Sequence, residues 1–162
     1  MSLPPVIRQH LEQHHSLHVE SSRSLSGGCI HQAQTIETQR GTFFLKYNEA
    51  KQAHNFEVEK QGLGILKESG AVRVPTVYGT HEVGAHAYFL AEFIPSGAKA
   101  SDFWEQLGTA LAHLHLRSTE SFGLDHNNYI GALPQSNRPW TKWAEFYQRE
   151  RFAASCTVKE ID

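Results

Sequence analysis

The stretch SGGCIHQAQTIETQRGTFFLK, residues 26–46, decides the fold that the sequence predicts. It opens on two glycines and a cysteine. A polar run rich in Ile, Thr and Gln comes next, and a tight turn then leads into an apolar run that ends in Lys46. Two β-prone runs with turn residues between them are typical of a β-hairpin. We therefore expect strands at residues 30–38 and 42–47, with the two glycines in the loop before the first.

The flanking sequence supplies further elements with clear periodicity. Apolar residues at helical spacing predict two helices early in the chain, and β-prone runs predict three more strands. The helices are expected at residues 4–15 and 50–69, and the strands at residues 17–25, 74–80 and 86–94.

The segment Pro95-Ser96-Gly97 breaks the chain after the last of these strands. A helix, a polar loop at residues 122–139 and a final helix from Trp140 are expected to follow. Five antiparallel strands carrying one helix form an α+β lobe. We therefore predict two domains, a lobe at residues 1–97 and a partial helical lobe at residues 98–162.

The composition of the 162 residues excludes several classes of protein. The formal net charge is −2, so no basic footprint for nucleic acid or for a membrane surface is present. No apolar run is long enough to span a bilayer, and the first residues lack the apolar core of a signal peptide. Two cysteines form no disulfide framework. We expect a cytoplasmic protein without nucleic-acid or membrane partners.

Eleven histidines raise the question of a metal site. His10, His14 and His18 could share one face of the first helix. However, His18 falls beyond the expected end of that helix, and no carboxylate or cysteine completes the set. We expect surface histidines and no metal site there.

Lys46 is the first candidate functional residue. Strand alternation places Phe44 and Lys46 on one face of the sheet. On the next helix, the 3.6-residue period places Glu59 inside the buried stripe and Glu57 well outside it. Because a buried carboxylate needs a partner, we expect Glu59 to pair with Lys46.

The glycine-rich loop, the strand lysine and the helix glutamate occur in the order found in the small lobe of protein-kinase-like folds. In that arrangement, the backbone around Gly27 and Gly28 would cover the phosphates of ATP, and Lys46 would hold phosphate oxygens. The strand at 86–94 would lead into a hinge, where main-chain groups of Glu92 and Ile94 meet the adenine edge.

Five stretches of the sequence, together spanning about residues 20–152, resemble the fructosamine kinase (ketosamine-3-kinase) family, part of the aminoglycoside-phosphotransferase-like group. They are SGGCIHQAQTIETQRGTFFLK, NFEVEKQGLGILKESGAVRVPTVYG, YFLAEFIPSG, LGTALAHLHLRSTESFGLDHNNYIGALPQSN and WTKWAEFYQRERF. The most specific parts are the Gly-Gly-Cys loop, NYIGALPQSN and the helix with the pattern W-x-x-F-Y-x-x-R.

The resemblance implies an ATP-dependent kinase that phosphorylates the sugar of ketosamines on protein amines, as a step in protein deglycation. It implies ribulosamine or fructosamine adducts as substrates, with Mg²⁺ as the companion of ATP. The nucleotide-binding residues that it carries over are Gly27, Gly28, Cys29, Lys46 and Glu59, together with the hinge around Glu92.

One part of the family pattern is not found in this sequence. The family's catalytic loop, of His-Gly-Asp-Leu-x-x-x-Asn type, and its magnesium-binding Asp should follow WAEFYQRERF, where this sequence reads AASCTVKEID. Asp102, Asp125 and Asp162 have the context for neither role. We therefore expect no catalytic residue and no Mg²⁺ ligand in these 162 residues, and no turnover by this chain alone.

Two other functions stay open at this stage. The first is a pseudokinase or fragment that binds nucleotide without turnover, which the missing loop favours. The second is a related small-molecule kinase of aminoglycoside or choline type, against which NYIGALPQSN and WAEFYQRERF argue.

Self-association is a further expectation. In the family, the loop cysteine, Cys29 here, is implicated in redox-sensitive, disulfide-linked dimers, and the alternative is a small residue that fits the loop. A half-built helical lobe would also expose an apolar face that could join two copies.

Overall fold

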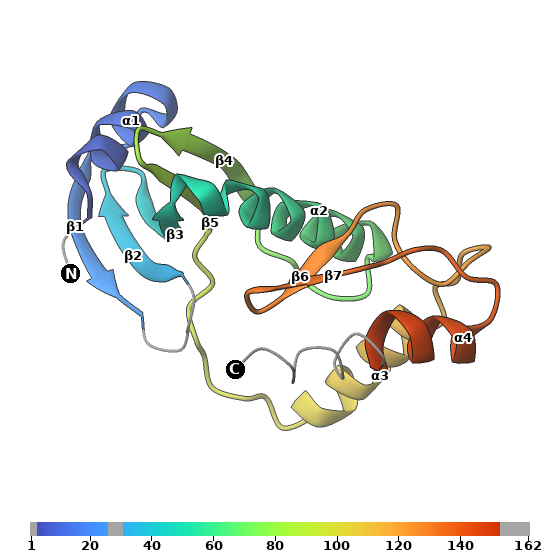
Figure 1. Cartoon of the computed structure of the whole chain (residues 1–162). Coiled ribbons are helices and arrows are strands. Elements are labelled where there is room, and N and C mark those ends of the chain that lie inside the picture. The colour runs from blue at the N-terminus through green and yellow to red at the C-terminus, as the bar shows by residue number, and fades with distance from the viewer. Residues whose placement is uncertain (1–2, 26–30, 153–162) are drawn as a thin grey trace.

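The structure is a computed structural model, and it describes residues 3–25 and 31–152. Its main body is a five-stranded antiparallel sheet with the strand order β1-β2-β3-β5-β4 (Figure 1). Its strands are β1 (Val19–Ser24), β2 (Gln32–Thr38), β3 (Gly41–Glu49), β4 (Val77–Val83) and β5 (His86–Glu92). The helices are α1 (Pro5–His15), α2 (Ala53–Ser69), α3 (Phe103–His115) and α4 (Trp143–Tyr147), and a small hairpin joins β6 (Asn128–Ile130) to β7 (Leu133–Gln135).

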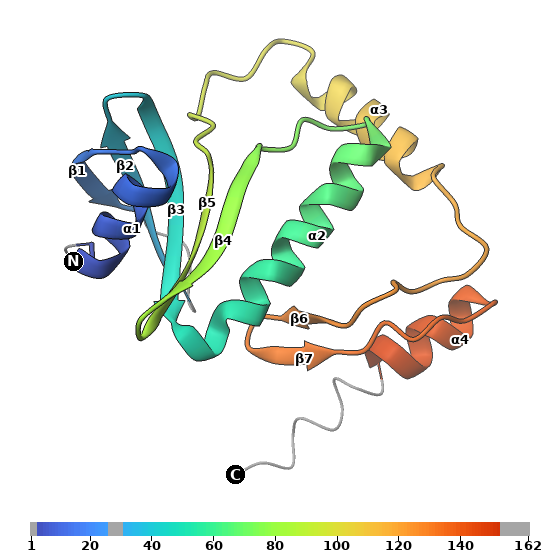
Figure 2. The same ribbon diagram turned by 90° about the horizontal axis from the view of Figure 1, so that it is seen from above.

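Strand β3 lies at the centre of the sheet, and its side chains alternate between the two faces. Phe43, Leu45 and Tyr47 are buried on the face that α1 covers, where they join Ile7 and Leu11 of that helix in one core cluster. The predicted alternation is therefore confirmed. The alternation leaves Phe44 and Lys46 on the opposite face of β3, the side of the sheet on which α2 lies (Figure 2).

The second core cluster lies under α2. Phe56 of that helix is fully buried and packs with Ala87, Phe89 and Ala91 of β5. Phe44 of β3 packs against the same cluster. Strand β5 thus contributes buried residues to both faces, as its continuous apolar sequence predicts.

Local sequence signals account for the ends of the first two helices. Proline stands at the first turn of α1, where its missing N–H costs no hydrogen bond. Helix α2 ends at Gly70, whose backbone is left-handed with φ 64° and whose N–H bonds the Lys67 carbonyl. The helix predicted at 50–69 begins three residues later, because residues Ala50–Gln52 form a 3-10 turn.

The predicted α+β class with a five-stranded antiparallel sheet is confirmed, and three local predictions are wrong. The strand expected at 74–80 runs instead from Val77 to Val83. The polar loop at 122–139 contains the β6/β7 hairpin, and the helix expected from Trp140 begins at Trp143.

Helix α3 has apolar residues at helical spacing but buries none of its residues. Trp104 is 69% exposed, and Leu107 and Leu111 are exposed as well. The division at residues 97 and 98 and the expected self-association both stay predictions. Among the described residues, no helix has the length and apolar character that crossing a membrane requires.

Candidate nucleotide-binding site

Lys46 and Glu59 form an ion pair between the sheet and α2. The Nζ atom of Lys46 lies 2.6 Å from Oε1 of Glu59, so the predicted contact is present. Both side chains are partly buried, with 25% and 33% of their surfaces exposed. Such a charge-assisted hydrogen bond fixes the direction of the lysine side chain while leaving its ammonium group accessible.

The position of Glu59 follows from the way α2 docks on the sheet. Phe56 anchors the helix in the core, and Glu59 lies three residues further along, so both project from nearby positions on one face. Lys46 occupies the middle of β3, where Ala33 of β2 and Phe89 of β5 flank it. The pair thus joins two rigid elements.

Glu57 corrects the helical-wheel prediction. The period placed it well outside the buried stripe, yet its carboxylate accepts a hydrogen bond of 2.7 Å from Thr80 on β4. This bond, aided by Lys60, lowers the pKa of Glu57. Helix α2 therefore has carboxylate contacts to the sheet at two points, toward β3 and toward β4.

His31 stands beside the pair and was missed by the sequence analysis. Its ring packs on Phe56 with 4.7 Å between centroids, and its Nδ1 accepts a hydrogen bond from the amide of Asn48 at 3.1 Å. Burial lowers the pKa of His31, and the charge of Lys46 lowers it further. Both effects disfavour the protonated form of the imidazole. The only sequence signal was its place next to the glycine-rich loop.

An apolar cavity of about 310 Å³ lies at the end of β5. Its lining includes Leu25, Phe44, Pro75 and Ile94. Phe44 and Lys46 are two residues apart on the same face of β3, a separation of about 7 Å along a strand. An apolar slot and a cation therefore share one side of the sheet.

Glu92, at the rim of this cavity, connects β5 to the chain before β4. Its carboxylate bonds the guanidinium of Arg73 at 2.6 Å and the N–H of Thr76 at 3.1 Å. The Thr76 hydrogen bond, and after it Arg73, lowers the pKa of Glu92. The N–H of Glu92 itself donates to the Thr76 carbonyl at 2.8 Å.

The predicted site residues Gly27, Gly28 and Cys29 lie outside the described residues.

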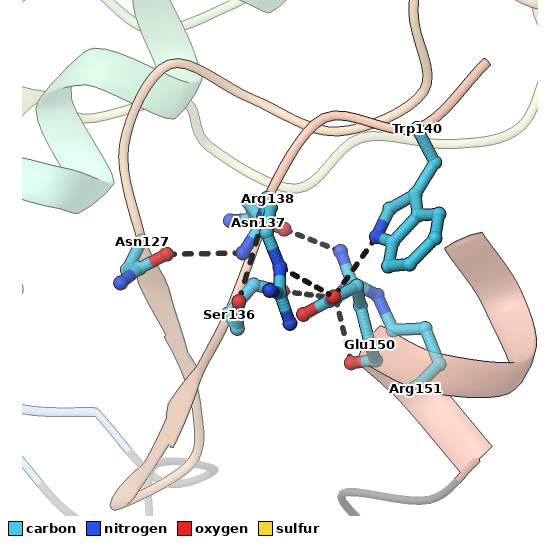
Figure 3. A network of polar contacts seen from close by, with 7 residues as sticks. All are labelled: Asn127, Ser136, Asn137, Arg138, Trp140, Glu150 and Arg151. Carbon is cyan, nitrogen blue, oxygen red and sulfur yellow. Dashed lines mark hydrogen bonds and ion pairs between the residues drawn. The ribbon is translucent and has the colours of Figure 1, made fainter. Parts of the chain in front are cut away.

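A network of polar groups holds the loop after the β6/β7 hairpin against the π-helical segment Gln148–Phe152, which follows α4 (Figure 3). The backbone N–H of Asn137, a residue that is 1% exposed, donates a hydrogen bond of 3.0 Å to Oδ1 of Asn127. Glu150, which is 3% exposed, accepts hydrogen bonds from Trp140 at 2.9 Å and from Arg138 at 3.4 Å. Hydrogen bonds from Ser136 and Trp140 lower the pKa of Glu150. The sequence analysis missed this network as well.

An antiparallel lobe with a lysine–glutamate pair and an apolar slot beside its last strand has the organisation of a kinase nucleotide-binding lobe. The model of the fructosamine kinase family matches residues 4–160, and the chain belongs to this family.

Relatives with assigned functions agree with that placement. A protein assigned as a ketoamine kinase in Synechocystis is 35% identical over 82% of this chain and 45% of its own length. The chloroplastic protein-ribulosamine 3-kinase of Arabidopsis thaliana is 32% identical over 93% of this chain and 47% of its own length. The chain spans about half the length of the curated relatives that it matches.

Solved structures show the same kinase-like fold. A crystal structure assigned as a fructosamine-3-kinase from Haemophilus somnus superposes with a TM-score of 0.84 at 24% identity, covering 96% of this chain and 55% of that one. A spectinomycin phosphotransferase in complex with ADP and spectinomycin gives a TM-score of 0.52 at 16% identity, covering 70% and 37%.

Proposed function

We propose that this chain binds ATP as the nucleotide-binding part of a kinase that phosphorylates the sugar of ketosamines. The observation that carries the proposal is the 2.6 Å contact between Lys46 and Glu59. In kinases such a pair sets the lysine against the nucleotide phosphates. Membership in the fructosamine kinase family supports ribulosamine or fructosamine adducts on protein amines as substrates, and with them a role in protein deglycation.

Each part of the nucleotide has a counterpart among the residues of this lobe. The adenine would occupy the apolar cavity next to Phe44, with its edge against the carbonyl of Glu92 and the N–H of Ile94. Lys46 would contact phosphate oxygens, and Glu59 would orient it. The loop around Gly27, Gly28 and Cys29 is assigned to the phosphates by the family resemblance.

The described residues do not fit a magnesium site. No group of three or more His, Cys, Asp and Glu side chains within 3–25 and 31–152 is arranged to hold a metal ion. Asp102 accepts a hydrogen bond from Gln106, and the side chain of Asp125 is 92% exposed beside His126. The proposal for this chain therefore concerns binding and positioning of the nucleotide.

The surroundings of Asp102 and Asp125 also favour a second candidate, a nucleotide-binding chain without turnover. We expect no phosphorylated product when this chain alone is mixed with Mg-ATP and a ribulosamine. Stoichiometric product in a mass-spectrometric assay would contradict that expectation and favour the active enzyme.

The nucleotide proposal is tested by thermal unfolding of the chain with and without Mg-ATP. A ligand that binds only the folded state at one hundred times its Kd stabilises it by about 2.7 kcal/mol. We expect Mg-ATP to raise the Tm of the parent chain and to leave that of Lys46→Ala unchanged. Lys51→Ala is the matched control, because Lys51 is 71% exposed and pairs with Glu49 away from the cavity. Equal shifts in all three proteins would refute the assignment of Lys46.

A further inference from the structure

Two histidines from distant parts of the sequence meet at the junction of α1 and β4. The Nε2 atom of His15, the last residue of α1, lies 3.1 Å from Nε2 of His81 on β4. Both side chains are partly buried, and 66 residues separate them in the chain. Figure 1 shows α1 beside the end of β4, on the face of the sheet opposite to α2. This pair has no part in the proposed nucleotide site.

The separation of the two nitrogen atoms suits a metal ion. Imidazole nitrogens bind transition metals at about 2.0–2.1 Å, so atoms 3.1 Å apart subtend roughly 100° at the metal. That angle lies between the square-planar and the tetrahedral values. The ring planes of His15 and His81 are inclined at 78°, in an edge-to-face arrangement.

The absence of a side chain at Gly79 leaves space for the rings of His15 and His81. A Cβ atom at this position would stand 2.6 Å from Nε2 of His81 and 3.6 Å from Cε1 of His15. Any other residue would therefore push the His81 ring away. The backbone of β4 is shaped so that both imidazoles can approach each other.

More imidazole and hydroxyl groups surround the pair. The ring of His10 is 5.0 Å from that of His81 and stacks on His14 at 3.9 Å. Its Nδ1 bonds the hydroxyl of Tyr88 at 2.8 Å, so this ring is held in place.

The protonation of the two rings sets a condition on metal binding. Neutral imidazole is the form that binds metals. In the neutral pair, one ring donates its Nε2–H to Nε2 of the other. The donor ring must move this proton to its own Nδ1 before both Nε2 atoms can bind an ion.

We propose that His15 and His81 form a two-histidine site for a divalent transition metal, which binds Cu²⁺ most tightly and completes its coordination with water. Imidazole ligands suit Cu, Ni and Zn, and divalent affinities peak at Cu²⁺. A metal at this point would join α1 to the edge strand β4 and stabilise the docked helix.

The proposal is tested by calorimetric titration of the chain with Cu²⁺, Ni²⁺ and Zn²⁺ at pH 7.5. We expect one Cu²⁺ per chain and an affinity at least about tenfold weaker in His81→Gln, since even indirect partners of metal ligands change affinity 10–100-fold. His113→Gln is the matched control, because His113 is exposed on α3. It should bind Cu²⁺ as the parent chain does.

Gly79→Ala makes the test independent of the number of histidines. This variant keeps all eleven but displaces the His81 ring from His15. We expect it to lose the tight Cu²⁺ site, while circular dichroism and the Mg-ATP response stay those of the parent. Parent-like Cu²⁺ affinity in Gly79→Ala or His81→Gln, or no one-to-one binding at micromolar Cu²⁺, would overturn the proposal.

Discussion

Phe56→Ala is expected to lower the free energy of unfolding by about 3–5 kcal/mol, the usual cost of removing a buried phenyl ring. Phe56 is fully buried beneath α2 and contacts Phe89 and His31 through its ring. Removing it leaves a cavity where the helix meets the sheet. The loss can be measured as a shift of the urea midpoint, followed by circular dichroism.

The same substitution should also weaken nucleotide binding. Glu59 follows Phe56 by three residues, so a helix that loses its anchor no longer holds the carboxylate at 2.6 Å from Lys46. We expect the Mg-ATP shift in Tm to shrink in Phe56→Ala and to persist in Phe56→Leu. A stability loss combined with an unchanged ATP response would show that the helix anchor and the lysine pair are independent.

Ile65→Ala provides the control on the same helix. Ile65 is 44% exposed, so its truncation removes little buried surface, and a change within about 0.5 kcal/mol is expected. Comparable destabilisation by Phe56→Ala and Ile65→Ala would mean that α2 does not dock on β5 as described.

The nucleotide-binding lobe could be predicted because its signals are local and periodic. Alternation along β3 placed Lys46 opposite to Leu45, and the helical period placed Glu59 on the docking face of α2. Lys46 and Glu59 are 13 positions apart, on a strand and on the helix that follows it. Because most arrangements pack such a helix against its own sheet, the two side chains could be expected to meet. The family resemblance then suggested what geometry alone does not, namely the nucleotide that we propose as the ligand.

The features that the sequence analysis missed depend on contacts between distant segments. The β6/β7 hairpin has strands of three residues, too short for a detectable alternation, and its turn needs the left-handed φ of 65° at Gly131. Glu57 reaches Thr80 because α2 presents a second carboxylate to β4. His15 and His81 carry no local signal, since only the docking of α1 brings them together.

Glu150 is the clearest case of such a residue, because in the segment QRERF it reads as a surface charge. The structure buries it to 3% exposure, with hydrogen bonds from Trp140 and Arg138 (Figure 3). Ser136 contributes to the low pKa of its carboxylate. A buried charge must be compensated by such partners. The hydrogen bonds to this carboxylate therefore hold the loop after β7 against the residues around Glu150.

Glu150→Ala is therefore expected to destabilise the segment by about 2–3 kcal/mol, near the upper range for a lost hydrogen bond to a charged group. Glu150→Gln keeps an acceptor for the indole N–H of Trp140 and should lose less. The readout is the urea midpoint of Trp fluorescence together with the rate of proteolysis between β7 and α4. Glu145→Ala is the control, because Glu145 is half-exposed on α4, five residues before Glu150, and pairs only with Lys142 among the described ion pairs.

The pH dependence gives a second measure of the same interaction. Hydrogen bonding holds the pKa of Glu150 below its ordinary value of 4.5. The stabilisation is then complete above pH 4.5 and is lost as the pH falls through the lower pKa of the folded state. The difference in stability between the parent and Glu150→Gln should shrink over that acidic interval. The interpretation would be contradicted by a stability difference that does not change with pH, or by equal losses in Glu150→Ala and Glu145→Ala. Either result would show that the ionised carboxylate of Glu150 does not stabilise the segment by accepting hydrogen bonds.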